Sequence, residues 1–490
     1  MKVLLINSES LYIKQKAAIP LGLLSIATFL TSNGHTVRIY DRAVEKKSVK
    51  TQLDDFKPDI VGIAAPASFN DALKISRIVK ERSIPVIWGG QVTSLIPDIV
   101  LKSGVVDFVV VGEGEITMLA LINALINKTS FHSVDGIVFI EDGKIITNKE
   151  REFAELSQLP IIDFSYVDPT KYWIKNSNYD KLLFVYATKG CPFSCSYCYN
   201  SCLSKGIWRA RPAEYVLSEI KYLTENFGME GVYFTDDLFF SNKAYLKSFC
   251  NSIIDSGLKF VWSCEARADC CTREDLQLMY DTGCRWIFFG IESGSEEMQI
   301  KLRKGLDLQK ARKTIEICRE IGITTTTSFM LGFVDETEDE IRKTVEYAKS
   351  VKADSKIAFK FKPIPKSKLY EELIREKRIS EPRTLKDCKN FTWMDALYHN
   401  YSKVPDKDLK VISSFFYLSL LRNGKKDKKS ESRGWTKRLF FQTLDILKRG
   451  SFKSIILLIL SAKELFEIMY YAVFFPKVRR KYGLDFKKNK

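Results

Sequence analysis

The chain lacks the features of several large protein classes. Its N-terminus has only a short apolar run and no small-residue cleavage site, so it does not look like a secretory signal and we expect a cytoplasmic protein. Only 25 Gly and 14 Pro occur in 490 residues, which excludes fibrous and disordered compositions. Eleven Cys is an odd number, so metal ligation or core packing is expected rather than a disulfide framework.

Acidic residues are scarce in the C-terminal tail. Residues 422–490 contain 19 Lys and Arg against six Asp and Glu, which gives this tail a net charge of +13. The whole chain carries +16, so residues 1–421 are close to neutral. The basic character therefore belongs to the tail and not to the body of the protein.

Short apolar runs alternate with helical patterns in the first 130 residues. The runs are Val3–Asn7, Val37–Tyr40, Ile60–Ala65, Val86–Gly90 and Phe108–Gly112. Continuous Val- and Ile-rich runs separated by helices predict a parallel sheet covered on both faces. We therefore expect an α/β fold with a doubly wound domain at residues 1–130, followed by a hairpin and linker at 131–176.

Ligands of such sheets bind outside the C-terminal ends of the strands. A dinucleotide is disfavoured, because no Gly-x-Gly-x-x-Gly follows the first strand. The Pro20–Leu23 helix entry, the Gly-Gly pair after the fourth strand and the Gly-Glu-Gly-Glu run after the fifth resemble the cobalamin-binding domain found ahead of many radical S-adenosylmethionine (SAM) enzymes. The resemblance implies a corrinoid contacted by Ser8, Ser68, Gly89, Gly90, Gly112, Glu113 and Gly114.

The Asp-x-His-x-x-Gly signature, which supplies a lower axial His in one class of cobalamin methyltransferases, is missing. His35 is the only His of this domain and is expected in a surface turn between a helix and a strand. Any bound cobalamin is therefore expected base-off, without a His below cobalt. The alternative is a degenerate domain that holds no corrinoid.

Three Cys follow an apolar strand with the spacing C-x-x-x-C-x-x-C: Cys191, Cys195 and Cys198. Each can bind one iron of a 4Fe-4S cluster, which leaves the fourth iron without a protein ligand. A zinc site is disfavoured because no second Cys pair follows, and Cys202, just beyond the loop, is not expected to be a ligand.

The Cys segment resembles the signature of the radical SAM superfamily. The resemblance implies that the open iron binds the amino and carboxylate groups of SAM. It also implies that reduction of the sulfonium yields methionine and a 5′-deoxyadenosyl radical. An electron donor such as flavodoxin or ferredoxin is then expected as a partner.

Six apolar strands alternate with helical patterns over residues 177–370. The expected strands are Leu182–Ala187, Gly231–Thr235, Phe260–Cys264, Arg285–Gly290, Ile323–Leu331 and Lys356–Phe361. This repetition predicts a partial (β/α)6 barrel of the TIM type, with the active site at the C-terminal ends of its strands.

The strand ends carry further likenesses to the superfamily. The SAM contacts implied by the resemblance are Tyr197, Asp236, Asp237, Glu292, Ser293 and Gly332. The Asp pair is expected at the ammonium, Glu292-Ser293 at the ribose and Gly332 on the adenine side. The two Asp have alternatives: they could cap the next helix or pair with Arg209 or Arg211.

Two motifs depart from the superfamily pattern. Glu265 replaces the aromatic residue of a "FRAD" box, which leaves the role of Arg267 open. Val334 and Asp335 replace the Pro and second Gly of a G-x-P-G-E-T loop, which puts the geometry of that loop in question.

Helical patterns replace the strand-helix alternation after residue 370. Residues 371–423 are expected to pack on the barrel, and 424–490 form a basic, aromatic, amphipathic tail. Charged residues interrupt its apolar stretches, so we do not expect a transmembrane helix. An anionic membrane surface is the favoured partner of the tail, on the inner face of the membrane; a helical cap on the barrel and an RNA-binding tail are the alternatives.

These features favour a radical SAM enzyme with a 4Fe-4S cluster, SAM and cobalamin that methylates an unactivated carbon. The expected substrate is a small molecule or lipid whose identity the sequence does not specify, and the basic tail favours a lipid or isoprenoid. Three alternatives stay open: ring formation or rearrangement with the same cofactors, a tRNA methylthiotransferase, and a non-catalytic iron-sulfur module at a membrane. The methylthiotransferase is disfavoured, because the N-terminal domain lacks Cys for a second cluster and the C-terminus looks helical. Nucleic acid is not an expected partner.

Overall fold

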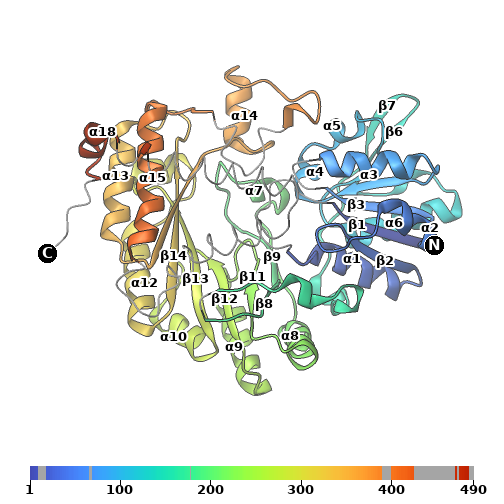
Figure 1. The fold of residues 1–490 in the computed structure, drawn as a ribbon, viewed down its shortest axis with the longest axis horizontal. Coiled ribbons are helices and arrows are strands. Elements are labelled where there is room, and N and C mark those ends of the chain that lie inside the picture. Colours follow the sequence, from blue (N-terminus) through green and yellow to red (C-terminus); the bar gives the residue numbers. More distant parts are fainter. Residues whose placement is uncertain are drawn as a thin grey trace.

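Two parallel sheets lie beside each other in the computed structural model (Figure 1). The structure describes residues 1–8, 18–65, 69–176, 178–388, 399–423, 470–471 and 474–484. The blue N-terminal sheet occupies one side of Figure 1, and the green-to-orange barrel sheet occupies the other. The expected α/β fold class with two parallel sheets is therefore confirmed.

The N-terminal sheet has the strand order β2-β1-β3-β4-β5-β6-β7. Its strands are β1 (Lys2–Asn7), β2 (Thr36–Asp41), β3 (Ile60–Ala64), β4 (Val86–Gly89), β5 (Phe108–Val110), β6 (Ile137–Glu141) and β7 (Lys144–Thr147). The first five are parallel, and the predicted hairpin β6-β7 joins antiparallel at the edge of β5. The order 2-1-3-4-5 places a topological switch point between β1 and β3, which is where such sheets bind ligands.

Helices cover both faces of this sheet. They are α1 (Leu21–Ser32), α2 (Val49–Phe56), α3 (Asn70–Lys80), α4 (Gln91–Leu95), α5 (Pro97–Leu101) and α6 (Gly114–Asn127). Alternate residues of β1 face opposite sides: Leu5 enters the core that contains α1 and α6, whereas Leu4 enters the core that contains α2 and α3. This two-sided burial explains the unbroken apolar runs in the sequence.

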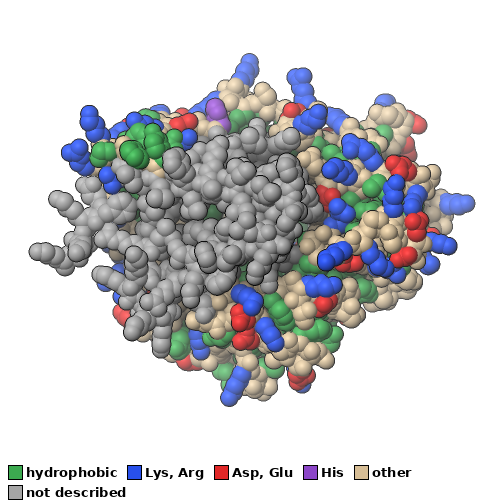
Figure 2. Space-filling model, in the orientation of Figure 1, with side chains coloured by type: hydrophobic (Ala, Val, Ile, Leu, Met, Phe, Trp, Pro, Cys, Tyr) green, Lys and Arg blue, Asp and Glu red, His purple; other side chains and the backbone are tan. Residues whose placement is uncertain are grey.

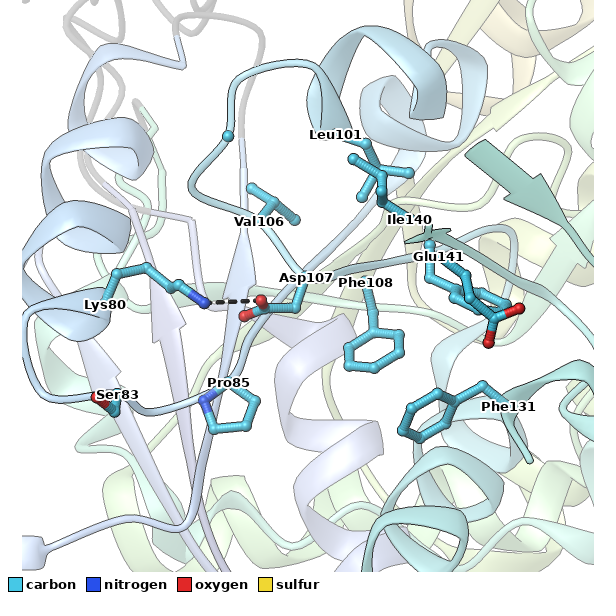
Figure 3. A pocket seen from close by; sticks show the side chains of 12 residues that line it. Lys80, Ser83, Pro85, Leu101, Val106, Asp107, Phe108, Phe131, Ile140 and Glu141 are labelled. Carbon is cyan, nitrogen blue, oxygen red and sulfur yellow. Dashed lines mark hydrogen bonds and ion pairs between the residues drawn. The ribbon is translucent and has the colours of Figure 1, made fainter. Parts of the chain in front are cut away.

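The N-terminal ends of the strands form the edge opposite the ligand edge. His35 lies there, and it is buried instead of being at the surface as predicted, because its ring packs beside the N-terminal amine at 3.3 Å. The same edge has a hollow of about 460 Å³ beside Pro85 and Phe108, where Lys80 pairs with Asp107 (Figure 3). Neither feature belongs to the predicted corrinoid site.

The second sheet has the order β15-β14-β13-β12-β11-β8, all parallel. Its strands are β8 (Leu182–Val185), β11 (Gly231–Phe234), β12 (Val261–Ala266), β13 (Cys284–Glu292), β14 (Thr324–Leu331) and β15 (Ser355–Lys360). The helices between them are α8 (Ala213–Phe227), α9 (Lys243–Ser256), α10 (Arg273–Asp281), α11 (Glu296–Lys301), α12 (Leu308–Ile321) and α13 (Glu338–Ser350). The predicted partial barrel is confirmed strand by strand.

The end of the chain returns to the barrel. Helix α14 (Lys368–Arg375) follows the barrel, and α15 (Asp406–Asn423) lies along β15. After α18 (Pro476–Lys481), Tyr482 and Leu484 are buried in the main core, as the cap alternative expects. The rest of the predicted tail, 424–469, lies outside the described residues. Within the described part of the chain, no helix is long and apolar enough to cross a membrane.

Candidate functional site

The predicted cluster ligands lie on one loop at the mouth of the barrel. Cys191, Cys195 and Cys198 follow β9 (Thr188–Gly190) and precede α7 (Asn200–Leu203), and all three are free and partly exposed. In the described segments, no three His, Cys, Asp or Glu side chains converge on a single ion.

Strand pairing and ring stacking hold this loop. Strand β9 pairs antiparallel with β10 (Trp208–Ala210). Gly190 ends β9 with φ +85°, and a Cβ there would lie 2.1 Å from the carbonyl oxygen of Ile207, so only Gly fits. Between the first two Cys, the Phe193 ring lies beneath the Arg267 guanidinium at 4.2 Å from the ring centroid. Although Glu265 replaces the aromatic residue of the "FRAD" box, the Arg of that box, Arg267, contacts the cluster loop.

The thiols of Cys191 and Cys198 depend on a nearby cation to become thiolates. Burial raises the pKa of Cys191, and it raises the pKa of Cys198 to about 12. The neighbouring thiol of Cys195 and the carboxylate of Asp237 shift both values further in the same direction. Ligation by iron supplies the compensating positive charge, so the donor set fits a 4Fe-4S cluster with one open iron.

Asp236 lies at the C-terminal end of β11 and clamps the bend that leads into β9. Its Oδ1 accepts hydrogen bonds from the backbone N–H groups of Ala187, at 2.9 Å, and of Thr188. Burial raises the pKa of Asp236 to about 7, and Oδ2 has no hydrogen-bond partner within the described residues. Backbone amides thus occupy one oxygen, and the contact with the SAM ammonium stays a prediction.

Asp237 lies closer to the cluster loop. Its carboxylate accepts hydrogen bonds from the N–H of Gly190 and from the hydroxyl of Tyr199, both at 3.1 Å. The alternative that the Asp pair binds Arg209 or Arg211 is wrong, because both guanidinium groups pair with Glu side chains elsewhere. Asp237 therefore contacts the cluster loop at both of its ends, and its contact with the SAM ammonium stays a prediction.

A triad that includes a residue missed by sequence reasoning lies beside Cys195. The Nζ atom of Lys304 is 3.3 Å from Oε1 of Glu292 and 3.4 Å from the hydroxyl of Tyr197. The Tyr197 ring packs against Phe333 with centroids 5.6 Å apart. Two predicted SAM contacts, Tyr197 and Glu292, are thus brought together by a lysine that follows α11 in a Lys-Gly turn. That turn looks like an ordinary helix end, so it gave no signal.

The loop after β14 keeps the backbone opening predicted at Gly332, which has φ +82°. The N–H groups of Gly332 and Phe333 donate to Oε2 of Glu336 at 2.7 and 3.1 Å. Glu336 is fully buried and burial raises its pKa to about 8. Asp335 adopts φ +55° where the superfamily has Gly, so the loop is preserved by a strained Asp and a buried Glu.

Ser293 faces the outer helices. Its hydroxyl lies 2.9 Å from that of Thr344 on α13 and accepts a hydrogen bond from the N–H of Ser295. The side chain is fully buried. The Ser293 hydroxyl thus joins β13 to α13, and the ribose contact of Glu292 stays a prediction.

Aromatic rings and the carboxyl of Glu265 line the interior of the barrel. Phe184, Tyr233, Trp286 and Phe288 form a chain of rings with successive centroids 5.4, 5.2 and 6.1 Å apart. The Tyr233 hydroxyl donates to Oε1 of Glu265 at 3.1 Å. Burial raises the pKa of Glu265, and the nearby carboxylates of Asp237 and Glu292 raise it further. This lining offers apolar surface and one hydrogen-bonding carboxyl to a substrate.

The predicted corrinoid contacts lie along the C-terminal edge of the N-terminal sheet. Gly90 has φ +115° and Gly112 has φ +80°, and an added Cβ at Gly112 would meet no atom within 4 Å. Ser94, which sequence reasoning missed, joins the two loops: its hydroxyl donates to the Gly90 carbonyl at 2.8 Å and accepts from the Gly112 N–H at 3.0 Å. Gly90 and Gly112 thus leave the backbone open along this edge, as the predicted corrinoid site requires.

Four other predicted corrinoid residues have different outcomes. Ser8 donates to the Ala64 carbonyl at 2.8 Å, next to the β1/β3 switch point. Gly114 is required by packing, since its Cβ would lie 2.6 Å from Ile26 on α1. The Glu113 carboxylate is paired with Arg209 of β10, and its contact with a corrinoid stays a prediction. Ser68 lies outside the described residues.

Two stretches of the chain match known families. Residues 15–122 match the B12 binding domain, and residues 185–348 match the radical SAM superfamily. These stretches contain the open glycine edge and the cluster loop described above.

The chain is also similar to curated proteins. An uncharacterized methyltransferase of Pyrococcus horikoshii is 28% identical over 410 residues, which are 81% of this chain and 88% of that protein. The anaerobic magnesium-protoporphyrin IX monomethyl ester cyclase of Rubrivivax gelatinosus is 25% identical over 364 residues, 71% of this chain and 65% of that protein.

A solved structure shares the fold. The radical SAM methyltransferase TsrM from Kitasatospora setae, with tryptophan substrate and a SAM analogue bound, matches with a TM-score of 0.68 at 18% identity and covers 76% of both chains. With both domains matched in sequence and in fold, the chain is a radical SAM enzyme with a B12 binding domain ahead of its barrel.

Proposed function

We propose that the protein is a cobalamin-dependent radical SAM methyltransferase that acts on an unactivated carbon. The observation that carries this proposal is the direct junction of two sites: strands β9 and β10, which frame the three-Cys loop, are bonded to the loop after β5 of the B12 binding domain. The methyltransferase named among the relatives supports the same choice.

The residues of the chain have separate tasks in this reaction. Cys191, Cys195 and Cys198 hold the cluster, which supplies the electron for reductive cleavage of SAM when it is bound. Asp237 offers a carboxylate to the SAM ammonium and Glu292 one to the ribose hydroxyls. The aromatic interior of the barrel excludes water from the substrate carbon.

Cobalamin is expected base-off with no His as its lower ligand. His35 is the only His among residues 1–130, and it lies on the opposite edge of the sheet from Gly90 and Gly112. Absorption and electron-spin-resonance spectra of the loaded protein would show neither a His nitrogen nor the cofactor's own base on cobalt. Failure to retain cobalamin under anaerobic loading would support the degenerate-domain alternative.

The test of the function begins with the cluster. The anaerobically reconstituted protein should contain about four irons and cleave SAM when reduced, with loss of both in the C191A/C195A/C198A variant. Methyl-labelled SAM and cell extracts then report the product. A labelled product supports methyl transfer, whereas iron and cleavage that persist in the triple variant would refute the proposal.

Ring formation is the second candidate, because a cyclase is among the similar proteins. It predicts SAM cleavage and a modified substrate without incorporation of the labelled methyl group, so the same experiment distinguishes the two reactions.

Three further parts of the proposal concern the partners of the protein. Flavodoxin or ferredoxin donates the electron, the substrate is a lipid or isoprenoid, and the tail binds the inner face of an anionic membrane.

A further inference from the structure

Two cations of the β9-β10 ribbon stand side by side. Lys189 of β9 and Arg209 of β10 are direct partners in the antiparallel register, so their side chains leave the ribbon on the same face. Like charges opposite each other in a two-stranded ribbon destabilise it unless negative groups compensate them. The ribbon therefore carries a doubly positive face that needs acidic partners.

The partners come from the other domain. The Nζ atom of Lys189 lies 3.0 Å from Oε1 of Glu115 and 3.8 Å from Oε1 of Glu113. Arg209 binds Glu113 through both of its terminal nitrogens and donates to the carbonyl of Ala154 at 2.6 Å. The Gly-Glu-Gly-Glu run after β5 thus places two carboxylates opposite the two cations.

These four charges are largely removed from water. The side chain of Glu115 is 5% exposed, that of Arg209 is 13% exposed, and those of Glu113 and Lys189 are 22% and 24% exposed. Burial opposes the charge on Glu115, yet Lys189 and a 2.6 Å hydrogen bond from Ser25 hold the pKa of its carboxyl below the usual range. Such groups contribute modestly to net stability, but removal of one partner leaves a buried uncompensated charge.

The position of the four residues relates them to both cofactor sites. Lys189 is two residues before Cys191, and Glu113 directly follows Gly112 of the corrinoid edge. A change in these contacts would therefore shift the cluster loop relative to that edge, because only two peptide bonds separate Lys189 from Cys191 and one separates Glu113 from Gly112.

We infer that Lys189, Arg209, Glu113 and Glu115 are positioning residues that form an interdomain clamp, which sets the distance and orientation between the corrinoid edge and the cluster loop. The inference rests on the proposed use of both cofactors. None of the four residues is a catalytic residue in this proposal, because each acts by holding a backbone segment that carries a site.

The test compares Lys189→Met with a matched control, Lys205→Met. Lys205 also pairs with a carboxylate of the chain before the barrel, Glu150, but the two side chains are 48% and 65% exposed, so their pair is expected to contribute little. Glu113→Gln is a milder second variant, because its amide oxygen still accepts a hydrogen bond from Arg209.

The first readout is the magnetic coupling between the reduced cluster and cob(II)alamin in the doubly loaded protein. We expect a shifted and broadened distance distribution in Lys189→Met, a smaller shift in Glu113→Gln and no change in Lys205→Met, with iron and cobalamin contents equal in all four proteins. A change in overall stability alone would not move this distance.

The second readout needs no cofactor. Hydrogen exchange of the cofactor-free chain should increase together in peptides that contain residues 111–116 and 188–210 of Lys189→Met, and not in Lys205→Met. Unchanged coupling and unchanged exchange in Lys189→Met would overturn the clamp. If the wild-type chain retains no cobalamin, the proposed function fails, and the exchange experiment still decides the clamp.

Discussion

Arg267 illustrates how one side chain supports the cluster loop. Its guanidinium stacks on Phe193 and pairs with Asp269 at 2.8 and 3.0 Å. Cation–π contacts at desolvated sites contribute about 2 kcal/mol. Without the guanidinium, the loop loses this contact and Asp269 is left with an uncompensated charge.

We therefore expect Arg267→Met to release iron faster than wild type when a chelator is added to the reconstituted protein. Arg285→Met is the matched control, because the Arg285 guanidinium also stacks on a ring, that of Tyr280 at 4.3 Å, but at the opposite end of β13 from the cluster. Equal rates of iron release in the two variants would contradict this role of Arg267.

Glu336 predicts how stability depends on pH. Burial raises its pKa from 4.5 to about 8 in the folded protein. The folded state therefore binds the proton more tightly than the unfolded state, and the resulting stability is complete below pH 4.5 and is lost as pH rises toward about 8. The slope contributed by one such group is at most about 1.4 kcal/mol per pH unit.

Glu336→Gln removes this titration and keeps an oxygen that can accept from Gly332 and Phe333. Urea unfolding at several pH values should show that the variant loses less stability than wild type between pH 5 and about 8. Parallel stability curves for the two proteins would show that Glu336 is not the group responsible.

Residue types alone predicted the cluster ligands but not the directions of neighbouring side chains. The Cys spacing predicts Cys191, Cys195 and Cys198 as the ligands because three thiols on one short loop have few other uses, and the structure places all three on one loop. Glu113 was assigned to a corrinoid, yet its partner Arg209 lies 96 residues away in the sequence. Contacts of this kind depend on the docking of two domains, which no local pattern encodes.

At the scale of elements, the β9-β10 ribbon depends on a glycine. An alanine at Gly190 would combine a left-handed φ with a Cβ 2.1 Å from the backbone oxygen of Ile207, so the two strands would have to separate. Gly206, in the same segment, also has a positive φ of +77°, but its Cβ would lie 3.8 Å from the nearest atom, the oxygen of Pro192. An alanine at Gly190 would therefore suffer both steric crowding and backbone strain, whereas an alanine at Gly206 would suffer backbone strain alone.

We expect Gly190→Ala to prevent assembly of the cluster, measured as iron and sulfide content after reconstitution. Gly206→Ala should assemble a full cluster and lose only about 1–2 kcal/mol of stability, the cost of the left-handed conformation. A full cluster in Gly190→Ala would show that the ribbon tolerates opening.

The elements themselves were predictable where a strand is buried on both faces. The five apolar runs of the N-terminal domain and the six of the barrel all form parallel strands. Uninterrupted apolar runs between helices are typical of a parallel sheet that helices cover on both faces. The sequence signal was weaker at strand ends, where β13 continues to Glu292 across an irregular register at Gly290. Beyond that irregularity, Glu292 has a positive φ of +66° and its carboxylate meets Lys304, which no run of residue types indicates.

At the scale of the molecule, the C-terminal end of the chain is fixed to the barrel. Lys481 Nζ and the Tyr482 hydroxyl each lie 3.1 Å from Oδ2 of Asp408, and Tyr482 and Leu484 are buried. Beside these contacts Tyr470 and Phe474 are 41% and 66% exposed. Figure 2 shows hydrophobic side chains next to Lys and Arg side chains over this part of the molecule.

This arrangement predicts two separable effects. Each exposed basic residue near an anionic bilayer contributes about 1 kcal/mol that salt screens, and exposed aromatic rings add a contribution that salt does not remove. Lys477 and Arg480 are exposed, whereas Asp408 is buried beneath the end of the chain. Charge reversal at Lys477 and Arg480 should therefore weaken membrane binding without destabilising the fold. A change at Asp408 should destabilise the fold without altering membrane binding.

We expect the full chain to co-sediment with anionic vesicles more than with neutral ones, and to retain part of this binding at high salt. Lys477→Glu/Arg480→Glu should weaken binding to anionic vesicles without a change in melting temperature. Asp408→Asn should lower the melting temperature, because Lys481 and Tyr482 lose a carboxylate partner, and leave vesicle binding unchanged. Equal binding to neutral and anionic vesicles would instead assign the whole tail to the cap, and would remove the reason for expecting a lipid substrate.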